Sequence, residues 1–296
     1  AQYARGDSLL INRASERFEF FGNVFAADSA NKTVFKSDYM SGDSTGNRSL
    51  VGESYLRNIN ADSTDSDTTH INAEIIRVRQ DSVYRITEAV DDVKIWTPDF
   101  SAVADSSILD DRRDVVELFM EPKVWYDNVQ LSGDYIRVDF DSSAIRELKA
   151  YPSPFSVAED SASGRLNQIT GDSLKAKFTE GRLSTITVYP TNAVLFHSTN
   201  EAGEADGAIE FNALQRTVLY FSEAGIDSVI SVKSVDGIYI PEFEKLSERK
   251  LEGFIWTPAL RPDRPGITLP DSSDALLPNV PFSLPLRFRQ YLRLRN

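Results

Sequence analysis

The chain has 296 residues, a formal net charge of −13 and 41 % hydrophobic residues, which is ample apolar material for a folded core. Its acidity argues against nucleic acid or an anionic membrane surface as the main partner, because both select clustered Lys and Arg. The absence of Cys excludes disulfides, thiolate metal sites and a cysteine nucleophile.

Short runs in which apolar and polar residues alternate dominate the chain, and this period of two predicts half-buried β-strands. In the run that starts at Gly133, Ile136, Val138 and Phe140 share one face. The other runs of this kind are Phe18–Phe25, Ala73–Arg79, Asp114–Met120, Ser184–Pro190 and Thr217–Phe221. Clusters of Asp, Ser, Asn and Gly separate them, as tight turns require. Pro241–Gly253 is the best helix candidate, although it equally fits a loop and a strand.

An internal repeat links two of these regions. Residues 133–157 align with residues 171–195 over 25 residues without a gap, at an offset of 171 − 133 = 38. The identical pairs are Gly133/Gly171, Asp134/Asp172, Phe140/Phe178, Tyr151/Tyr189 and Pro152/Pro190. A weaker copy covers 218–232. A strand–turn–strand unit with Gly-Asp at its entry cannot bury its apolar face alone, so the copies must stack. The sequence therefore predicts one elongated repeat domain over 1–256.

The last forty residues differ from the rest. Pro is frequent from Thr257 onward, which predicts an extended and loosely held tail over 257–296. The tail ends with Leu286–Asn296, where arginines interleave with apolar residues. This segment is either a frayed terminus or a docking segment, added as a strand or a short helix to a partner or to the domain itself.

The sequence GDSL occurs twice, at Gly6–Leu9 and Gly171–Leu174, and DTTH follows at Asp67–His70. In one family of lipolytic enzymes such blocks carry a serine nucleophile and its partners. The chain offers only His70 and His197, and it has no βαβ alternation to build that scaffold. In the repeat alignment Ser173 corresponds to Tyr135, so the serine is an outward residue rather than a nucleophile. We predict that the protein is not an enzyme.

The acidic stretch that contains Asp62, Asp65, Asp67 and His70 has oxygen ligands for a hard cation. It lacks the glycine and the terminal Glu of an EF-hand loop, so a solvated loop is the better interpretation. We predict neither a metal nor a cofactor. No run of eighteen apolar residues occurs, and the start at Ala-Gln is compatible with a cleaved secretory signal or a truncated chain.

Several motifs together resemble a known family. They are Asp92–Trp96, Asp105–Asp110, Pro122–Trp125, Gln130–Asp134 and Asn167–Asp172, with Gly22–Val24 near the N-terminus. The segments that hold them resemble the OstA-like proteins of the Bacteroidetes group, which belong with the LptA-type periplasmic lipopolysaccharide-transport proteins. The resemblance covers most of Gly6–Pro241, and the chain looks like the later repeats of a longer protein of this type.

The resemblance implies an antiparallel, V-shaped β-jellyroll whose apolar groove shields the acyl chains of lipid A. It further implies a periplasmic location with outer-membrane association, lipopolysaccharide or another acylated lipid as ligand, and end-to-end joining with other jellyroll proteins or with itself. A structural β-solenoid of a surface or filament assembly, with a closed core, is the alternative. From the alternation, the groove residues are Phe18, Phe20, Ile76, Val78, Val116, Leu118, Ile136, Val138, Phe140, Leu174, Ala176, Phe178, Ile186 and Val188.

Overall fold

The computed structural model describes residues 2–28, 32–59, 68–81, 84–141, 144–161, 163–200, 204–223, 225–243 and 245–266. The chain divides into two compact units. Unit 1 consists of 1–98, 110–112 and 263–296, and unit 2 consists of 99–109 and 113–262. Both units include residues of the span 1–256 and residues of the tail predicted over 257–296, and the single repeat domain stays a prediction.

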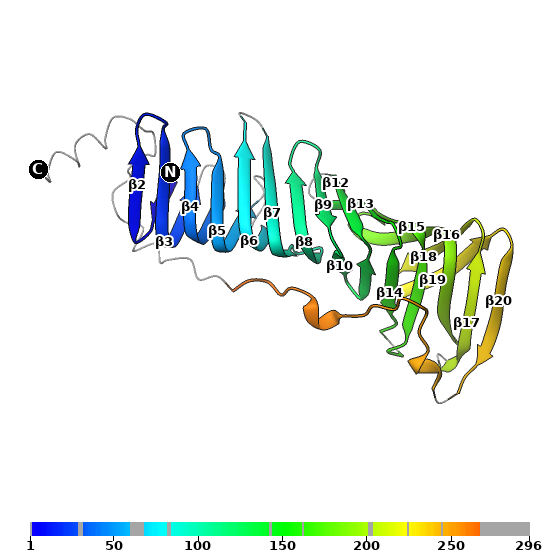
Figure 1. Ribbon diagram of the computed structural model, residues 1–296. Coiled ribbons are helices and arrows are strands. Elements are labelled where there is room, and N and C mark those ends of the chain that lie inside the picture. The colour runs from blue at the N-terminus through cyan, green and yellow to red at the C-terminus, as the bar shows by residue number, and fades with distance from the viewer. Residues whose placement is uncertain are drawn as a thin grey trace, which may run out of the picture. The chain divides into compact units, whose positions relative to one another are not determined.

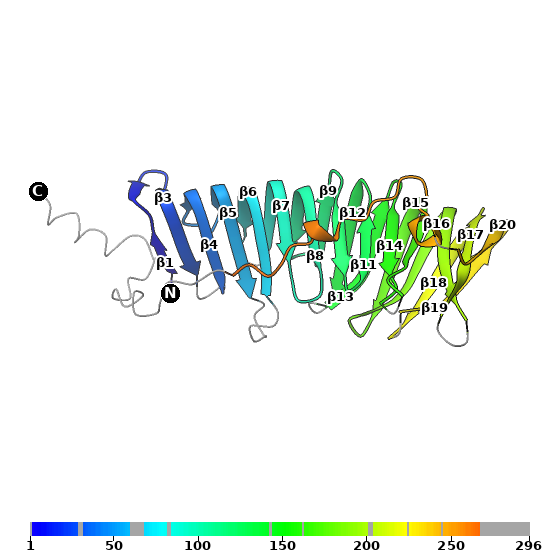
Figure 2. The ribbon, with the colours of Figure 1, turned by 90° about the horizontal axis from the view of Figure 1, so that it is seen from below.

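In the described part of unit 1, strands β3 to β7 lie side by side in chain order (Figures 1 and 2). Both β1 and β2 pair with β3, and from β3 to β7 each strand pairs with the next. The strands are β1 (Gln2–Arg5), β2 (Ser8–Asn12), β3 (Arg17–Asp28), β4 (Thr33–Asp43), β5 (Arg48–Ile59), β6 (Thr68–Gln80) and β7 (Arg85–Trp96).

Unit 2 contains the remaining strands and two short 3-10 helices, η1 (Leu246–Glu248) and η2 (Pro258–Leu260). The strands are β8 (Ser101–Asp110, whose last residue is assigned to unit 1), β9 (Val115–Phe119), β10 (Lys123–Tyr126), β11 (Val129–Ser132), β12 (Tyr135–Asp141), β13 (Ala144–Tyr151), β14 (Phe155–Glu159), β15 (Leu166–Thr179), β16 (Arg182–Thr199), β17 (Ala205–Ala213), β18 (Arg216–Ser222), β19 (Gly225–Val232) and β20 (Val235–Pro241). The ladders are antiparallel, which confirms the predicted all-β antiparallel fold.

Each long strand bends near its middle, and three of them, β3, β15 and β16, change partner at the bend. The first half of β15 pairs with β14 and its second half pairs with β13. Likewise β16 pairs with β18 before its bend and with β17 after it. In unit 1, β3 pairs with β2 over 17–21 and with β1 over 25–28. A register shift marks each bend, because an extra residue in one strand turns the chain.

The bends join two layers within each unit. In unit 2, layer A consists of β9, β12, β13, β18, β19, the second half of β15 and the first half of β16. Layer B consists of the start of β8, β10, β11, β14, β17, β20, the first half of β15 and the second half of β16. In unit 1, layer A holds β2 with the adjoining halves of β3 to β7, and layer B holds β1 with the other halves. We call the row of bends the corner, and the opposite side the mouth.

The ladders reproduce the repeat that the sequence shows. Besides the shifts at the bends, β12 has a register shift between Asp139 and Phe140. The equivalent shift in β15 lies between Lys177 and Phe178. The weaker copy has one between Tyr220 and Phe221 in β18. The three copies therefore share a bulge directly before the same Phe.

The structure corrects the role predicted for Gly-Asp. The pairs at Gly6 and Gly133 do separate strands, β1 from β2 and β11 from β12. The pair at Gly171 lies inside β15, at the bend, so the prediction of a turn that opens a strand is wrong there. The strand continues because its register shift at Thr170 and Gly171 turns the chain without breaking it. A side chain at 171 has no room, since an added Cβ would lie 2.2 Å from the Pro190 carbonyl oxygen.

The helix candidate Pro241–Gly253 contains only η1 within its described residues. Leu246 and Leu251 are both buried against Val157 and Leu195 of layer B. Apart from the short-range bonds around η1, the backbone of this segment is held by a side chain of the sheet, since the Leu251 amide donates to Gln168 Oε1 at 2.9 Å. Tertiary packing thus overrides the local helix signals.

The start of the predicted tail is also held in place. The Thr257 amide donates to Gln130 Oε1 at 2.8 Å, and Arg261 donates to the Asp127 carbonyl at 2.7 Å. Gln130 Nε2 in turn donates to the Ile255 carbonyl at 3.0 Å. The prediction of a loose tail from 257 is therefore wrong for 257–262, because Gln130 binds the Thr257 amide and the Arg261 side chain binds the backbone at Asp127. Residues 267–296, with the segment Leu286–Asn296, lie outside the described residues.

The two Gly-Asp glycines of the repeat give a matched test of the corner. Gly171→Ala places its Cβ 2.2 Å from backbone and 2.4 Å from Val188 Cγ1, so we expect a loss of ~1–3 kcal/mol in the free energy of unfolding. Gly133→Ala meets its nearest atom at 3.6 Å, an ordinary contact, and stays within ~0.5 kcal/mol. Urea unfolding followed by tryptophan fluorescence measures both. Equal losses in the two variants would contradict the close packing at Gly171.

Candidate functional site

Contacts between the layers of unit 2 show which face of each strand points inward. The ring of Tyr126 in layer B packs on Phe178 in layer A at a centroid distance of 4.9 Å, and its hydroxyl donates to the Gly181 carbonyl at 2.8 Å. Residues alternating with these two, such as Val124 and Ala176, are buried on the same inner faces. The space between the layers is therefore lined by apolar side chains.

Most of the groove residues predicted from the sequence are buried inside one unit or the other, four in unit 1 and the rest in unit 2. Twelve of the fourteen are at most 6 % exposed, and Phe140 and Phe178 are half-buried. The twelve are Phe18, Phe20, Ile76, Val78, Val116, Leu118, Ile136, Val138, Leu174, Ala176, Ile186 and Val188. Facing side chains already cover them, so a ligand reaches them only when the layers part. Their contact with lipid stays a prediction.

The mouth of unit 2 is bridged by aromatic pairs. Besides the pair of Tyr126 and Phe178, the rings of Phe100 and Phe140 lie 6.0 Å apart. Burial raises the pKa of the Tyr126 hydroxyl above its ordinary value, so the phenol stays protonated and can donate its hydrogen bond. Phe140 and Phe178 are thus the predicted groove residues that solvent reaches, at the side where the two layers separate most easily.

The outer face of layer A has the opposite character. Glu147 accepts from Lys175 at 2.6 Å and from Lys149 at 2.7 Å, and Arg137 pairs with Asp139 at 2.6 Å. These residues stand on neighbouring strands and alternate with the buried ones. The charged outer face and the apolar inner face fix the register, because a slip by one residue would exchange them.

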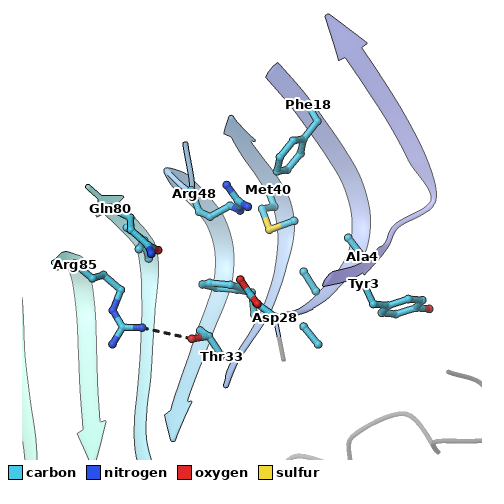
Figure 3. Close-up of a pocket in the computed structure, with 14 residues that line it drawn as sticks. Tyr3, Ala4, Phe18, Asp28, Thr33, Met40, Arg48, Gln80 and Arg85 are labelled. Carbon is cyan, nitrogen blue, oxygen red and sulfur yellow. Dashed lines mark hydrogen bonds between the residues drawn. The ribbon is translucent and has the colours of Figure 1, made fainter. Parts of the chain in front are cut away.

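Unit 1 has a cavity of about 40 Å³ between its layers (Figure 3). Phe18, Met40 and Val78 of layer A and Phe35 of layer B form apolar parts of its wall. Phe18 and Val78 belong to the predicted groove. At this size the cavity holds about one water molecule, not an acyl chain.

Two arginines border the cavity. Arg85 of layer A donates to Thr33 Oγ1 at 3.4 Å and to Asn58 Oδ1 at 3.2 Å, both in layer B, and pairs with Asp111 at 3.1 Å (Figure 3). The Arg85 side chain therefore joins the two layers at the mouth of unit 1 through hydrogen bonds. Figure 3 shows Arg85 reaching from one strand to Thr33 on another.

Arg48 lies on the apolar wall itself. Its guanidinium sits 5.0 Å from the centroid of the Phe18 ring and donates to the carbonyls of Asp43 and Asn47. Burial lowers the pKa of Arg48 from its ordinary value, although an arginine stays charged at neutral pH. Arginine side chains beside an apolar cavity suit an amphipathic ligand that has a hydrocarbon part and an anionic group.

The histidine of DTTH belongs to a packed aromatic cluster on the outer face of layer B. His70 is 3 % exposed, its Nδ1 hydrogen-bonds with the Tyr55 hydroxyl at 2.8 Å, and its ring meets Trp96 edge-on at 5.4 Å. Burial, with Arg264 and Arg57 nearby, lowers the pKa of His70 to about 4. Asp62, Asp65 and Asp67 lie outside the described residues.

The GDSL serines take part in no charge-relay pair within the described chain. Ser173 Oγ donates to the Tyr189 carbonyl at 2.9 Å, and Ser8 is exposed on β2. His197 is buried in β16, and its backbone amide donates to Asn167. A search of the described residues finds no group of three or more His, Cys, Asp or Glu placed to hold a metal, and no helix long and apolar enough to cross a membrane.

Comparisons with known proteins give one likeness to report. No family model and no curated protein matches the chain. A solved structure that it is similar to is that of LptH, described as the LptA-homologous periplasmic component of the lipopolysaccharide transport device of Pseudomonas aeruginosa. The match has 13 % identity and a TM-score of 0.28, and covers 51 % of this chain and 82 % of that one. A TM-score this low does not bear on the function of this chain, so the resemblance in the sequence motifs stays a prediction.

The residues at the mouths are not among those predicted from the sequence. Tyr126, Phe100 and Arg85 each bond or pack across the gap between layers, and Tyr126 and Arg85 each stand beside a hairpin. Their only sequence signal is an aromatic or an arginine at the end of an alternating run. That signal does not say which strand lies opposite.

His70 gives stability a defined pH dependence. The unfolded chain binds a proton at His70 near pH 6.5 and the folded chain only near pH 4, so the free energy of unfolding falls as the pH drops through that window. The slope from this group reaches about 1.4 kcal/mol per pH unit. His70→Gln removes that slope in urea titrations at pH 4.5 to 7. His197→Gln is the comparison variant: burial lowers the pKa of His197 as well, so this variant removes the share of the slope that His197 contributes and keeps the share of His70. An unchanged slope in His70→Gln contradicts the neutral buried imidazole.

A pair of arginine variants tests whether Arg85 holds the two layers of unit 1 together. Arg85→Met removes the hydrogen bonds of a charged side chain in layer A to Thr33 and Asn58, so it costs ~1.5–3 kcal/mol. Arg79→Met loses a surface pair with Glu88, at 2.9 Å and 66 % exposed on the arginine side, and costs less than ~1 kcal/mol. Binding of an apolar fluorescent dye should rise severalfold in Arg85→Met alone. Equal dye binding by both variants would show that Arg85 does not hold the mouth.

Proposed function

We propose that this protein is a non-enzymatic lipid carrier or bridge component that takes up the acyl chains of lipopolysaccharide between its two layers. The single observation that carries the proposal is the inward apolar face that runs through successive strands to a mouth closed only by side chains. The motif resemblance to OstA-like proteins supports lipopolysaccharide as the lipid and the periplasm, with outer-membrane association, as the location.

The energetics favour uptake without catalysis. Each CH₂ that moves from water into an apolar interior gains roughly 0.8 kcal/mol. Parting the mouth of unit 2 costs the Tyr126 hydrogen bond, ~1 kcal/mol, and the contacts of its aromatic pairs, ~0.5–1.5 kcal/mol each. Burying a few methylenes offsets the loss of these contacts, so a saturated acyl chain can replace them at the mouth. An energy source elsewhere sets the direction of transport.

Unpaired strand edges support end-to-end joining with another jellyroll protein or with a second copy. Within the described residues, β19 pairs only with β18 and β20 only with β17. Ile230, Val235, Ile238 and Tyr239 on these strands are each at least 51 % exposed. An edge of this kind offers backbone donors and acceptors together with apolar surface.

A structural subunit of a surface or filament assembly is the second candidate. The near-complete burial of the inward residues and the cavity of only about 40 Å³ favour it, because a closed core needs no ligand. The same edges serve polymerisation in that case. The two functions differ in whether the mouth opens to lipid.

Photocrosslinking in cells separates them. A photoreactive residue at Phe178, at the mouth, or at Phe140 should label lipopolysaccharide, while one at Lys177, which is exposed and next to Phe178, should not. We expect at least a tenfold difference in labelled lipid. If neither phenylalanine labels lipid, or if Lys177 labels it equally, the structural subunit with a closed core is the function instead.

A further inference from the structure

A row of aromatic rings lies on the outer face of layer A in unit 2, beside the corner. Tyr135 of β12 pairs with Phe119 of β9 on one side and with Tyr151 of β13 on the other. The centroid of its ring lies 5.3 Å from that of Phe119 and 5.0 Å from that of Tyr151. The neighbouring residues Ile136 and Ala150 are fully buried, so the three rings point outward. They form one stack across three strands.

The next strand interrupts this row. In β15 the residue beside Tyr151 is Ser173, one position beyond the pair formed by Ala150 and Leu174. On its other side Ser173 pairs with Tyr189 of β16. Tyr151 and Tyr189 are 48 % and 46 % exposed. The outer face therefore carries an exposed tyrosine on either side of a small serine.

The internal repeat shows what fits in this position. Ser173 aligns with Tyr135, and Tyr189 aligns with Tyr151. Two strand spacings, roughly 10 Å in all, separate the backbones of Tyr151 and Tyr189. The same two spacings separate Phe119 from Tyr151, and there the Tyr135 ring lies between them. Ser173 thus leaves a gap that is one six-membered ring wide between two exposed tyrosines.

Polar groups border both ends of this gap. Along β15, Lys175 pairs with Glu147 at 2.6 Å, and Glu147 also pairs with Lys149 at 2.7 Å. Toward the corner, Asp172 Oδ1 accepts from Asn192 Nδ2 at 3.3 Å. A sugar ring has C–H groups on its faces and hydroxyls around its edge, so it can stack on tyrosine and bond at both ends. An aromatic side chain would cover these polar groups without bonding to most of them, which costs free energy.

A cavity of about 530 Å³ continues from the gap around the corner. Ser153, Gly171 and Asn192 line it, and each lies two or three positions along the chain from a residue of the gap. Phe155 and Ile255 supply apolar wall. Sites for small ligands commonly have volumes of ~300–1,000 Å³ and combine apolar wall with a few polar groups. The cavity therefore has room for a further sugar ring.

The charges of the cavity select against anionic ligands. Its lining includes the carboxylates of Glu121, Asp134 and Glu252 and a single ammonium group, that of Lys123. Carboxylates accept hydrogen bonds from hydroxyls and repel other anions. A neutral sugar, whose hydroxyls both donate and accept, suits this lining better than a phosphorylated or carboxylated one.

We propose that the gap over Ser173 and the corner cavity together bind a neutral oligosaccharide. One sugar ring stacks between Tyr151 and Tyr189, and the next lies in the cavity. This site is at the corner, on the side of unit 2 opposite the mouth. It is therefore separate from the interior that takes up acyl chains and goes beyond the proposed function.

Calorimetric titration of the purified full chain tests the site without lipid. The probes are the N-acetylglucosamine trimer and cellotriose, which are neutral, and the galacturonic acid trimer, which is anionic. We expect at least one neutral trimer to bind, and to bind roughly tenfold or more tightly than the anionic one, because the cavity carboxylates repel the latter.

Three variants locate the binding. Ser173→Tyr fills the gap with a ring of the protein, as Tyr135 does in the other repeat, and should weaken binding about tenfold or more while the urea midpoint is kept. Tyr189→Ala removes one wall of the gap and should weaken binding similarly. Tyr220→Ala is the matched control, because Tyr220 is an exposed tyrosine on the same outer face, opposite Thr185 and away from the gap. Its affinity should equal that of the unaltered chain.

Several outcomes overturn the proposal. They are the absence of binding by both neutral trimers, equal binding of the anionic trimer, and an unchanged affinity in a folded Ser173→Tyr variant. N-acetyltyrosine amide, which offers a ring with a single hydroxyl, should not bind. If it binds as tightly as the sugars, the gap takes an aromatic side chain of a partner protein instead. None of these measurements uses lipid, so their failure leaves the lipid photocrosslinking result to stand or fall by itself.

Discussion

The bend in the middle of each long strand is the constraint on which the rest of this structure depends. A straight antiparallel ladder of twelve-residue strands would leave one apolar face in water. The register shifts at positions such as Phe21–Val24 and Thr170–Gly171 turn each strand, so that its two halves join different layers. The apolar faces of the two halves then cover each other. Gly171 shows how tightly this is done, since even a methyl group does not fit beside Pro190.

The bend also determines where the molecule can open. Layers that are continuous through the backbone at the corner can separate only at the mouth, where side chains alone join them. In unit 1 that joint is polar, from Arg85 to Thr33 and Asn58. In unit 2 it is aromatic, with Tyr126 on Phe178. Both joints cost little to break compared with a strand ladder. The proposed carrier function is therefore compatible with an interior that is buried at rest.

Polar side chains of the sheet also hold the C-terminal residues 249–257 in place. Gln130 and Gln168 stand on the outer face of layer B and satisfy backbone groups of residues 249–257, while Leu246 and Leu251 cover the apolar surface around them. A chain with few internal hydrogen bonds is held in this way by the sheet that it covers. The tail that appears loose in sequence is thus structural at its start.

The sequence by itself determined the strands, the all-β fold, the repeat and the inward side of most strands, because a period of two is a local property that burial of one face imposes. It placed Ile136, Val138, Leu174 and Ala176 in the interior by alternation alone. Only the tertiary structure decided that Gly171 lies within a bent strand, that Leu246 and Leu251 pack as loop residues, and that Tyr126 meets Phe178. Those features depend on which segments lie opposite one another, and alternation along one strand carries no information about its partner across the interior.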